Sequence, residues 1–272
     1  MATATLLEGV LRRDRAVVFL ALALVIGASW AYLLAGAGLS GAGAMAEGGP
    51  GGLTAAMATP ATWTLDYALL MVAMWWVMMV AMMLPSAAPM ILLHALIDRK
   101  TRERRGTAGG YLPTAAFTLG YLLVWGLFGV VAAGLQWAFE GAGLLAPATM
   151  SGTSALFAGV VLMFAGAYQL TPIKRACLKH CRRPLQFLSR HWRDGAGGAL
   201  RMGLHHGAYC LGCCWGLMAV LFFGGVMNLY WIAGLAALVL LEKLLPIGPR
   251  LGTVTGGLLL IWGARFLYEA IA

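Results

Sequence analysis

Long apolar runs separated by short polar or basic segments dominate the sequence. The runs cover residues 16–38, 63–97, 111–138, 152–171, 202–225, 228–245 and 251–271. Each is close to, or longer than, the roughly 20 residues with which an α-helix crosses the hydrocarbon core of a bilayer. The pattern predicts an all-α polytopic membrane protein, a bundle of about seven transmembrane helices in a single domain spanning residues 1–272.

Two prolines interrupt the longest of these runs. Pro85 and Pro89 lie within residues 63–97, and each removes a backbone donor and crowds the preceding helical turn. We therefore expect a kink there, and one more span if the helix breaks in two. The Gly-, Ala-, Thr- and Pro-rich stretch 39–62 predicts a flexible external loop.

The composition supports the membrane class and excludes an ordinary soluble domain. Hydrophobic residues make up 61% of the chain and charged residues 11%, against about half and a quarter in soluble domains. The net charge of +9 resides in the segments between apolar runs, where Lys and Arg govern membrane orientation. The predicted partner is therefore the lipid bilayer, with no nucleic acid.

The distribution of basic residues predicts the orientation. If the N-terminus is cytoplasmic, only Arg265 of the 19 Lys and Arg residues falls on the outer side, as the positive-inside rule requires. The run that follows Arg15 is longer than the roughly 7–15 residues of a signal-peptide core. We expect a retained first helix and a multi-pass protein of the bacterial inner (cytoplasmic) membrane.

A cysteine-rich stretch at residues 205–215 carries the strongest chemical signal. With about 100° of rotation per residue, Cys210 and Cys213 lie roughly +40° and −20° from His206, while Cys214 lies at roughly +80°. Imidazole and thiolate groups on one helix face suit Cu(I), with Zn(II) as a second option. The alternative is that these are small residues that let helices pack closely.

A second pair, Cys177 and Cys181, precedes this stretch by some 30 residues. Their i, i+4 spacing places both on one helix face, with His180 as a third donor and basic neighbours that favour thiolate. Both clusters fall on the predicted cytoplasmic side, where metal binding or thiol chemistry is favoured over stable disulfides. A hairpin could join them into one shared site.

Methionines mark the helix expected at residues 63–97. Met71, Met74, Met78 and Met82 lie within an arc of roughly 80°, and neutral thioethers are suitable stepping stones for Cu(I). The alternative is that these methionines are adaptable core fillers. Asp66 lies in the first turn, where an acid helps to start a helix or serves as an outer entry ligand.

The remaining charged residues give no enzymatic motif. Glu242 and Lys243 are adjacent, so they do not face one another on a helix and are either interfacial anchors or partners of different helices. Phosphate-binding loops, dinucleotide fingerprints, Ser-His-Asp arrangements and metalloprotease helix motifs are missing from the sequence. No catalytic residues or organic cofactor are predicted, and enzymatic activity stays open with a leaning against it.

Several motifs together resemble a known family. They are Ala81-Met82-Met83 with Pro85 and Pro89, Tyr168-Gln169-Leu170-Thr171-Pro172 with Lys174, Cys177, Cys181 and Pro184, Gly203, His206-Gly207, Tyr209-Cys210, Gly212-Cys213-Cys214-Trp215, Gly225-Val226-Met227-Asn228-Leu229, and Glu242-Lys243 with Pro246. The sequence resembles, over about residues 65–265, a bacterial domain of unknown function described as predicted metal-binding integral membrane proteins. The resemblance implies a multi-pass protein with Cys and His metal ligands. It singles out Lys174, Cys177, Cys181, His206, Cys210, Cys213, Glu242 and Lys243.

Three hypotheses follow. The leading one is an inner-membrane protein that binds a soft metal, favoured as Cu(I), and transports it or delivers it to a client. In it His206, Cys210 and Cys213 form the principal site, and Cys177 and Cys181 exchange the metal on the cytoplasmic side. The others are a membrane thiol–disulfide oxidoreductase and a structural or assembly subunit of a membrane complex. The oligomeric state is not predicted.

Overall fold

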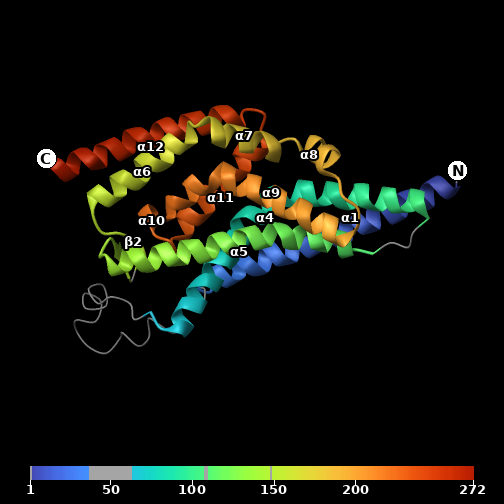
Figure 1. Ribbon diagram of the computed structural model, residues 1–272, viewed down its shortest axis with the longest axis horizontal. Helices are drawn as coiled ribbons and strands as arrows, with labels where there is room; N and C mark the ends of the chain where they lie inside the picture. Colours follow the sequence, from blue (N-terminus) through green and yellow to red (C-terminus); the bar gives the residue numbers. More distant parts are fainter. Residues whose placement is uncertain (1, 37–62, 107–109, 148) are drawn as a thin grey trace.

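The computed structural model describes residues 2–36, 63–106, 110–147 and 149–272 and shows an elongated helical bundle. Most helices run along its long axis, and the two chain ends lie at opposite ends of the bundle (Figure 1). The all-α prediction is confirmed for the described residues, apart from a two-stranded hairpin between α5 and α6 that was not predicted. The hairpin pairs β1 (Leu145–Ala146) with β2 (Ser151–Gly152) in antiparallel register.

Each apolar run contains a helix, although several of these helices extend well beyond the predicted bounds. The helices of the described ranges are α1 (Ala2–Leu34), α4 (Leu65–Arg105), α5 (Leu112–Gly141), α6 (Ala155–Gln169), α7 (Pro172–Cys181), α8 (Pro184–His191), α9 (Gly195–Ala219), α10 (Leu221–Gly224), α11 (Leu229–Leu244) and α12 (Gly248–Ile271). Short polar residues accept hydrogen bonds at several starts, among them Thr64, Ser154 and Thr171, as N-caps do. The expected loop at 39–62 lies outside the described residues.

Membrane-length helices are present, although fewer than the seven predicted spans. Within the described ranges, α1, α4, α5, α9 with α10, and α12 are long and apolar enough to cross a membrane. The pair α6–α7, bent by 65°, would make a sixth span. Helix α11 has only 16 residues. All seven apolar runs are thus largely helical, while the number of spans stays a prediction.

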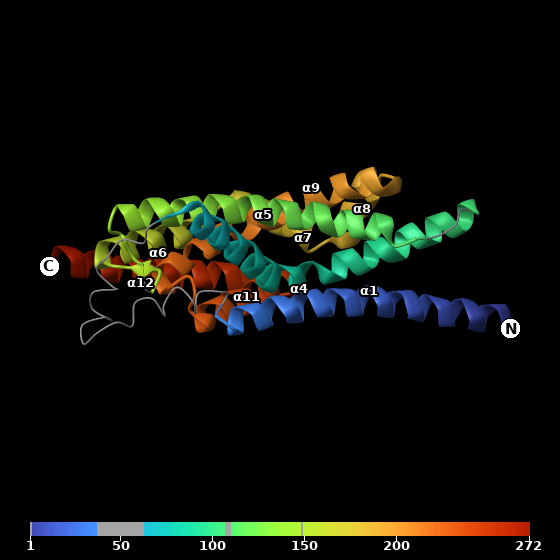
Figure 2. The ribbon, with the colours of Figure 1, turned by 90° about the horizontal axis from the view of Figure 1, so that it is seen from below.

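Helix α4 stays continuous through both prolines but changes direction along its length (Figure 2). Pro85 has no amide to donate to the carbonyl of Ala81 one turn earlier. The indole Nε1 of Trp30, from α1, donates to that carbonyl instead at 3.2 Å. The neighbouring helix therefore compensates the bend by satisfying the acceptor that the proline leaves free.

Glycines allow α5 and α9 to pack closely along much of their lengths. A Cβ atom added at Gly203 of α9 would lie 2.0 Å from the carbonyl oxygen of Phe117, and one at Gly120 of α5 would lie 2.3 Å from that of Leu200. Such backbone contact is typical of helix pairs that use small residues in membranes. This contact places the cysteine-bearing face of α9 against the core.

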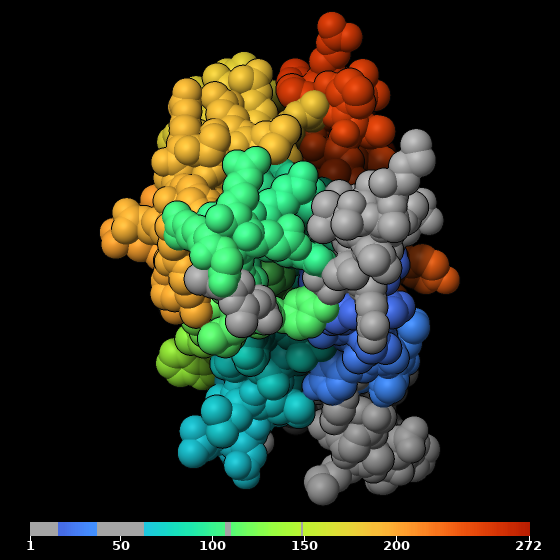
Figure 3. All heavy atoms as spheres, turned by 90° about the vertical axis from the view of Figure 1, so that its right-hand side faces the viewer, coloured from blue at the N-terminus to red at the C-terminus, as the bar shows by residue number. Residues whose placement is uncertain are grey.

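The end of α4 meets the segment from α8 to α9 at the end of the bundle that carries the N-terminus. In Figure 3 the end of α4, in green, lies beside the yellow-to-orange segment from α8 to α9. An ion pair of 3.0 Å between Arg105 and Asp194 joins these two parts. Hydrogen bonds from Trp192 and Arg105 hold the pKa of Asp194 below its ordinary value.

Candidate metal centre

The five cysteines converge although they come from two separate helices. Cys181 of α7 interacts with both Cys210 and Cys213 of α9. Cys177 lies so close to α9 that a Cβ atom added at Gly212 would be 2.8 Å from its sulfur. All five are free thiols; those on α9 are buried and those on α7 are half-buried. The predicted hairpin therefore does bring the two clusters together.

Cys210 occupies the most polar position in this cluster. Its Sγ atom lies 2.9 Å from the ammonium of Lys243 on α11 and 3.1 Å from the hydroxyl of Tyr121 on α5. Lys243 also donates to Oγ of Ser86, which follows Pro85 in the bend of α4, at 2.9 Å. Helices α5 and α11 thus supply polar groups to this thiol, and α4 holds the Lys243 ammonium through Ser86.

The bent part of α4 contributes a soft donor to the same place. Sδ of Met83 lies 3.8 Å from Sγ of Cys214, and the carbonyl of Met83 accepts a hydrogen bond from Tyr121 at 3.0 Å. Cys213 and Cys214 both donate to the carbonyl of Cys210, each at 3.0 Å. Those two thiols would have to rotate away from the carbonyl to bind a metal.

His206 lies one turn before Cys210 on α9, in an aromatic setting. Its ring stacks near Phe117 and Tyr121, at centroid distances of 6.1 and 5.7 Å. It is 3% exposed, yet its Nδ1 atom has no hydrogen-bond partner among the described residues. A buried imidazole nitrogen without a partner is costly, so this atom is available to a ligand.

The methionine stripe of α4 lies wholly inside the bundle. Met71, Met74 and Met78 are fully buried, and Met82 is 1% exposed. Met83, adjacent to Met82, reaches the thiols through Cys214. The four thioethers of Met71, Met74, Met78 and Met82, called the methionine column here, therefore end one residue before Met83, which contacts the cysteine cluster.

Glu242 and Lys243 contact different helices. This supports the interpretation that they are partners of different helices and not interfacial anchors. Glu242 forms a buried ion pair of 2.6 Å with Lys174 at the start of α7 and accepts from Gln169 at 2.9 Å. Arg182, just after α7, donates to the carbonyl of Glu242 at 2.7 Å. These contacts anchor α7, which carries Cys177 and Cys181, to the end of α11.

Two predicted candidates lie away from the thiols. Asp66 is exposed in the first turn of α4, next to the N-cap Thr64, a position that favours the helix-starting interpretation. His180 stacks on Tyr209 at a centroid distance of 4.1 Å, and its Nδ1 atom contacts the carbonyl of Ala176. It is directed at these groups rather than at the cluster.

Sequence reasoning missed several polar groups. Tyr121 and Ser86 have ordinary neighbours in the sequence, and only the packing of α5 and α11 against the bend of α4 reveals them. Gln136 and Glu140 of α5 are also buried. Gln136 and Glu140 are spaced i, i+4 at the end of an apolar run, and this spacing could have identified them as a polar pair on one helix face. The helix predicted at residues 111–138 ended before Glu140.

Two further observations limit the site. Among the described residues, no group of three or more His, Cys, Asp and Glu side chains is already arranged to hold a metal ion. Methionine lies outside that set of residue types, so the Met83–Cys214 contact adds a sulfur donor that the set does not count.

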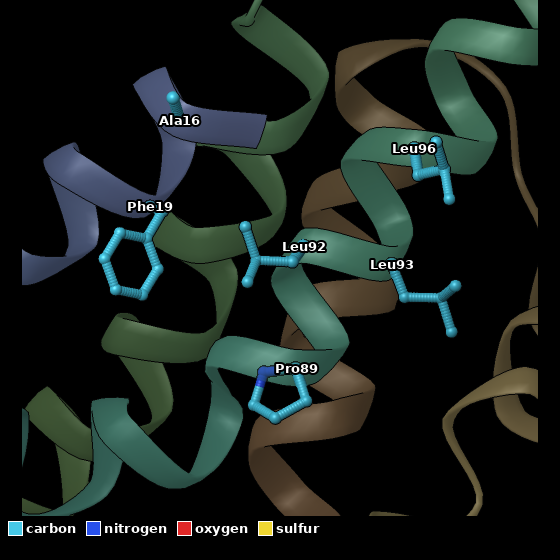
Figure 4. Close-up of a pocket in the computed structure, with 6 residues that line it drawn as sticks. All are labelled: Ala16, Phe19, Pro89, Leu92, Leu93 and Leu96. Atoms are coloured by element: carbon cyan, nitrogen blue, oxygen red, sulfur yellow. The ribbon is translucent and has the colours of Figure 1, made fainter. Parts of the chain in front are cut away.

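The hollow between α1 and α4 in Figure 4 is apolar and forms no part of the site; it is lined by Ala16, Phe19, Pro89, Leu92, Leu93 and Leu96.

Comparison with known families decides the broad assignment. The family model described as PpoB2, copper chaperone, matches residues 72–266, most of the chain. The chain belongs to the PpoB2 copper chaperone family. The matched range includes all five cysteines, His206 and most of the methionine column. No curated protein and no solved structure matches.

Membership of this family supports a copper-related role and agrees with the sequence-based expectation of a metal-related family. It supports copper rather than zinc as the metal. Cu(I) prefers thiolate and thioether ligands, and both kinds of sulfur meet where Met83 contacts Cys214. In a copper chaperone the ion is cargo, so the site must bind it and also release it.

Proposed function

We propose that the protein is a membrane-embedded Cu(I) chaperone that holds copper at the cysteine cluster and passes it to a client. The observation that carries the proposal is the close approach of α7 to α9, which brings Cys177 against Gly212 and Cys181 near Cys210 and Cys213, beside Lys243. These thiols come from separate helices, so packing assembles a soft-ligand set that neither segment has alone. Thiolate selects strongly for soft ions.

Charge balance supports the same assignment. Two thiolates and one Cu(I) carry a net charge of −1, and an uncompensated charge in a buried site is expensive. The ammonium of Lys243, 2.9 Å from Cys210, compensates it. The neighbouring Glu242 is already paired with Lys174, so its carboxylate does not cancel that ammonium.

The methionine column and α7 give the cargo a route in this proposal. The buried thioethers of α4 lead to Cys214 by way of Met83, and thioethers bind Cu(I) without supplying charge. Cys177 and Cys181 are half-buried on α7, which suits exchange with a client. His206, with its free nitrogen, is an additional ligand at the inner end.

A Cu(I) competition titration in detergent tests this role. The variant Cys210→Ser/Cys213→Ser should bind Cu(I) at least tenfold more weakly than wild type, because both thiolates that contact Cys181 are lost. Ser189→Ala, on the exposed face of α8, is the control and should not change binding. Equal copper binding in wild type and the double variant would refute the cluster. Zinc measured on the same samples compares the two metals.

The membrane placement is part of the proposal and has its own test. We infer seven spans with a cytoplasmic N-terminus in a bacterial inner membrane, supported by the apolar helices and by the basic segments. A fluorescent reporter that matures only in the cytoplasm should be dark when fused after Ala272 and bright when fused before Met1. The opposite pair of signals would reverse the orientation.

Thiol–disulfide exchange is the second candidate function, favoured by the contact of Cys181 with Cys210. Oxidation of this pair would join the two sulfurs and release two electrons and two protons, which a quinone would accept. Alkylation mapping separates the candidates. Redox activity predicts a reversible Cys181 disulfide, whereas copper handling predicts thiols that Cu(I) protects and a chelator exposes.

A further inference from the structure

A second polar site lies near the other end of the methionine column. Glu140, at the end of α5, accepts a hydrogen bond from the indole of Trp63 at 2.8 Å and one from the amide of Gln136 at 2.8 Å. The same Gln136 nitrogen lies 3.6 Å from Sδ of Met71, the first thioether of the column. The indole of Trp75 donates to the Gln136 oxygen at 2.8 Å.

The charge of this carboxylate is not compensated. Glu140 is 5% exposed and Gln136 is fully buried. Across the described ranges, no basic side chain lies within ion-pair distance of Glu140; its partners are the neutral indole and amide. Buried charges in proteins are paired or coordinate metals. Each carboxylate oxygen has one such donor, which leaves further lone pairs for a cation.

The column joins this site to the cysteine cluster. Met71 and Met83 are 12 positions apart on α4, about 18 Å at 1.5 Å per residue. Met74, Met78 and Met82 lie between them and are buried. One end of the column lies against the Gln136 amide that also bonds the Glu140 carboxylate, and the other end lies one residue before Met83, which contacts Cys214. The donors therefore become softer toward the cysteines.

We propose that Glu140 and Met71 form a second Cu(I) site, from which the ion enters the methionine column. The proposal rests on the proposed copper function. Glu140 supplies the negative charge that attracts the cation into a buried setting, and Met71 supplies the soft atom that favours Cu(I) over hard cations. Trp63 positions the carboxylate through its hydrogen bond. The Gln136 amide, which lies between Glu140 and Met71, has to turn aside when the ion binds. One carboxylate and one thioether bind more weakly than the thiolates, which suits an entry site.

Cu(I) titration of a variant in which all five cysteines are serine tests the site independently of the cluster. This variant should still bind one Cu(I), and Glu140→Gln in the same background should weaken that binding at least tenfold, because the charge is lost while the shape is kept. Met71→Leu should weaken it as well. The control Met90→Leu, at a buried position beyond Pro89, should leave it unchanged.

The outcomes separate the two proposals. If the five-serine variant binds no Cu(I) while wild type does, or if Glu140→Gln binds like its parent, the entry site is wrong and the cysteine cluster stands. If wild type and Cys210→Ser/Cys213→Ser bind alike, the chaperone assignment fails instead. Should the five-serine variant not fold, stoichiometry decides: wild type should bind one more Cu(I) than Glu140→Gln, and equal stoichiometry overturns the site.

Discussion

The ammonium of Lys243 lies 2.9 Å from Sγ of Cys210, a residue 33 positions earlier in the chain. The contact joins the last turn of α11 to the middle of α9, inside a bundle where few charged groups are buried. It gives the thiol cluster a fixed positive charge. The consequences of this arrangement can be tested one contact at a time.

Lys243→Gln should weaken Cu(I) binding by roughly tenfold or more. Glutamine can still donate a hydrogen bond but carries no charge, and hydrogen bonds to charged groups contribute roughly 1.5–3 kcal/mol, with tenfold in affinity for about each 1.4 kcal/mol. Competition titration measures the change. Lys100→Gln, at an exposed position on α4, is the control. Unchanged affinity would show that the site does not need the ammonium.

Gly212→Ala should separate α7 from α9. The added Cβ atom would lie 2.8 Å from the sulfur of Cys177, well inside van der Waals contact, so Cys177 must move. We expect faster alkylation of Cys177 and weaker Cu(I) binding, both measured on purified protein. Gly197→Ala on the same helix meets nothing within 4 Å and should leave both unchanged. Identical alkylation rates in the two variants would contradict the close contact.

Trp30→Phe should destabilise the bundle by about 1 kcal/mol, the usual net contribution of a hydrogen bond. The indole of Trp30 satisfies the carbonyl of Ala81 that Pro85 leaves free. In a Pro85→Ala background the helix amide can bond that carbonyl itself, so the same substitution should cost less. Thermal unfolding of the four proteins measures this coupling. If Trp30→Phe lowers the stability equally with and without Pro85→Ala, the Trp30 indole does not compensate for the amide that Pro85 lacks.

Lys174→Met should be strongly destabilising, by about 3–5 kcal/mol, because it leaves the carboxylate of Glu242 buried without a cation. The ion pair is 2.6 Å long and both side chains are 2% exposed. Lys174→Met/Glu242→Gln removes both charges and should recover much of the loss. The melting temperature in detergent reports both effects. A double variant less stable than the single one would show that this pair does more than balance charge.

The hydrophobic pattern by itself determined the all-α class and the approximate positions of seven helices. Seven apolar runs became α1, α4, α5, α6, α9, α11 and α12, because a helix satisfies its backbone hydrogen bonds within one continuous segment. Rotation along one helix also placed Cys210 and Cys213 on one face, since that depends only on local geometry. The bend of α4 at its prolines was predicted for the same reason.

Only the tertiary structure decided which helices meet. The contacts that define the site join distant segments. Helix α7 approaches α9, Lys243 contacts Cys210, and Glu242 pairs with Lys174. Gln136 links Glu140 to Met71. Periodicity carries no information about such partners, because it describes one helix at a time. Helix contacts depend on shape, as where Gly203 admits the backbone at Phe117. Packing therefore assembles the site. The sequence identified the cysteines and His206 as candidates, but it did not identify Tyr121 or Ser86.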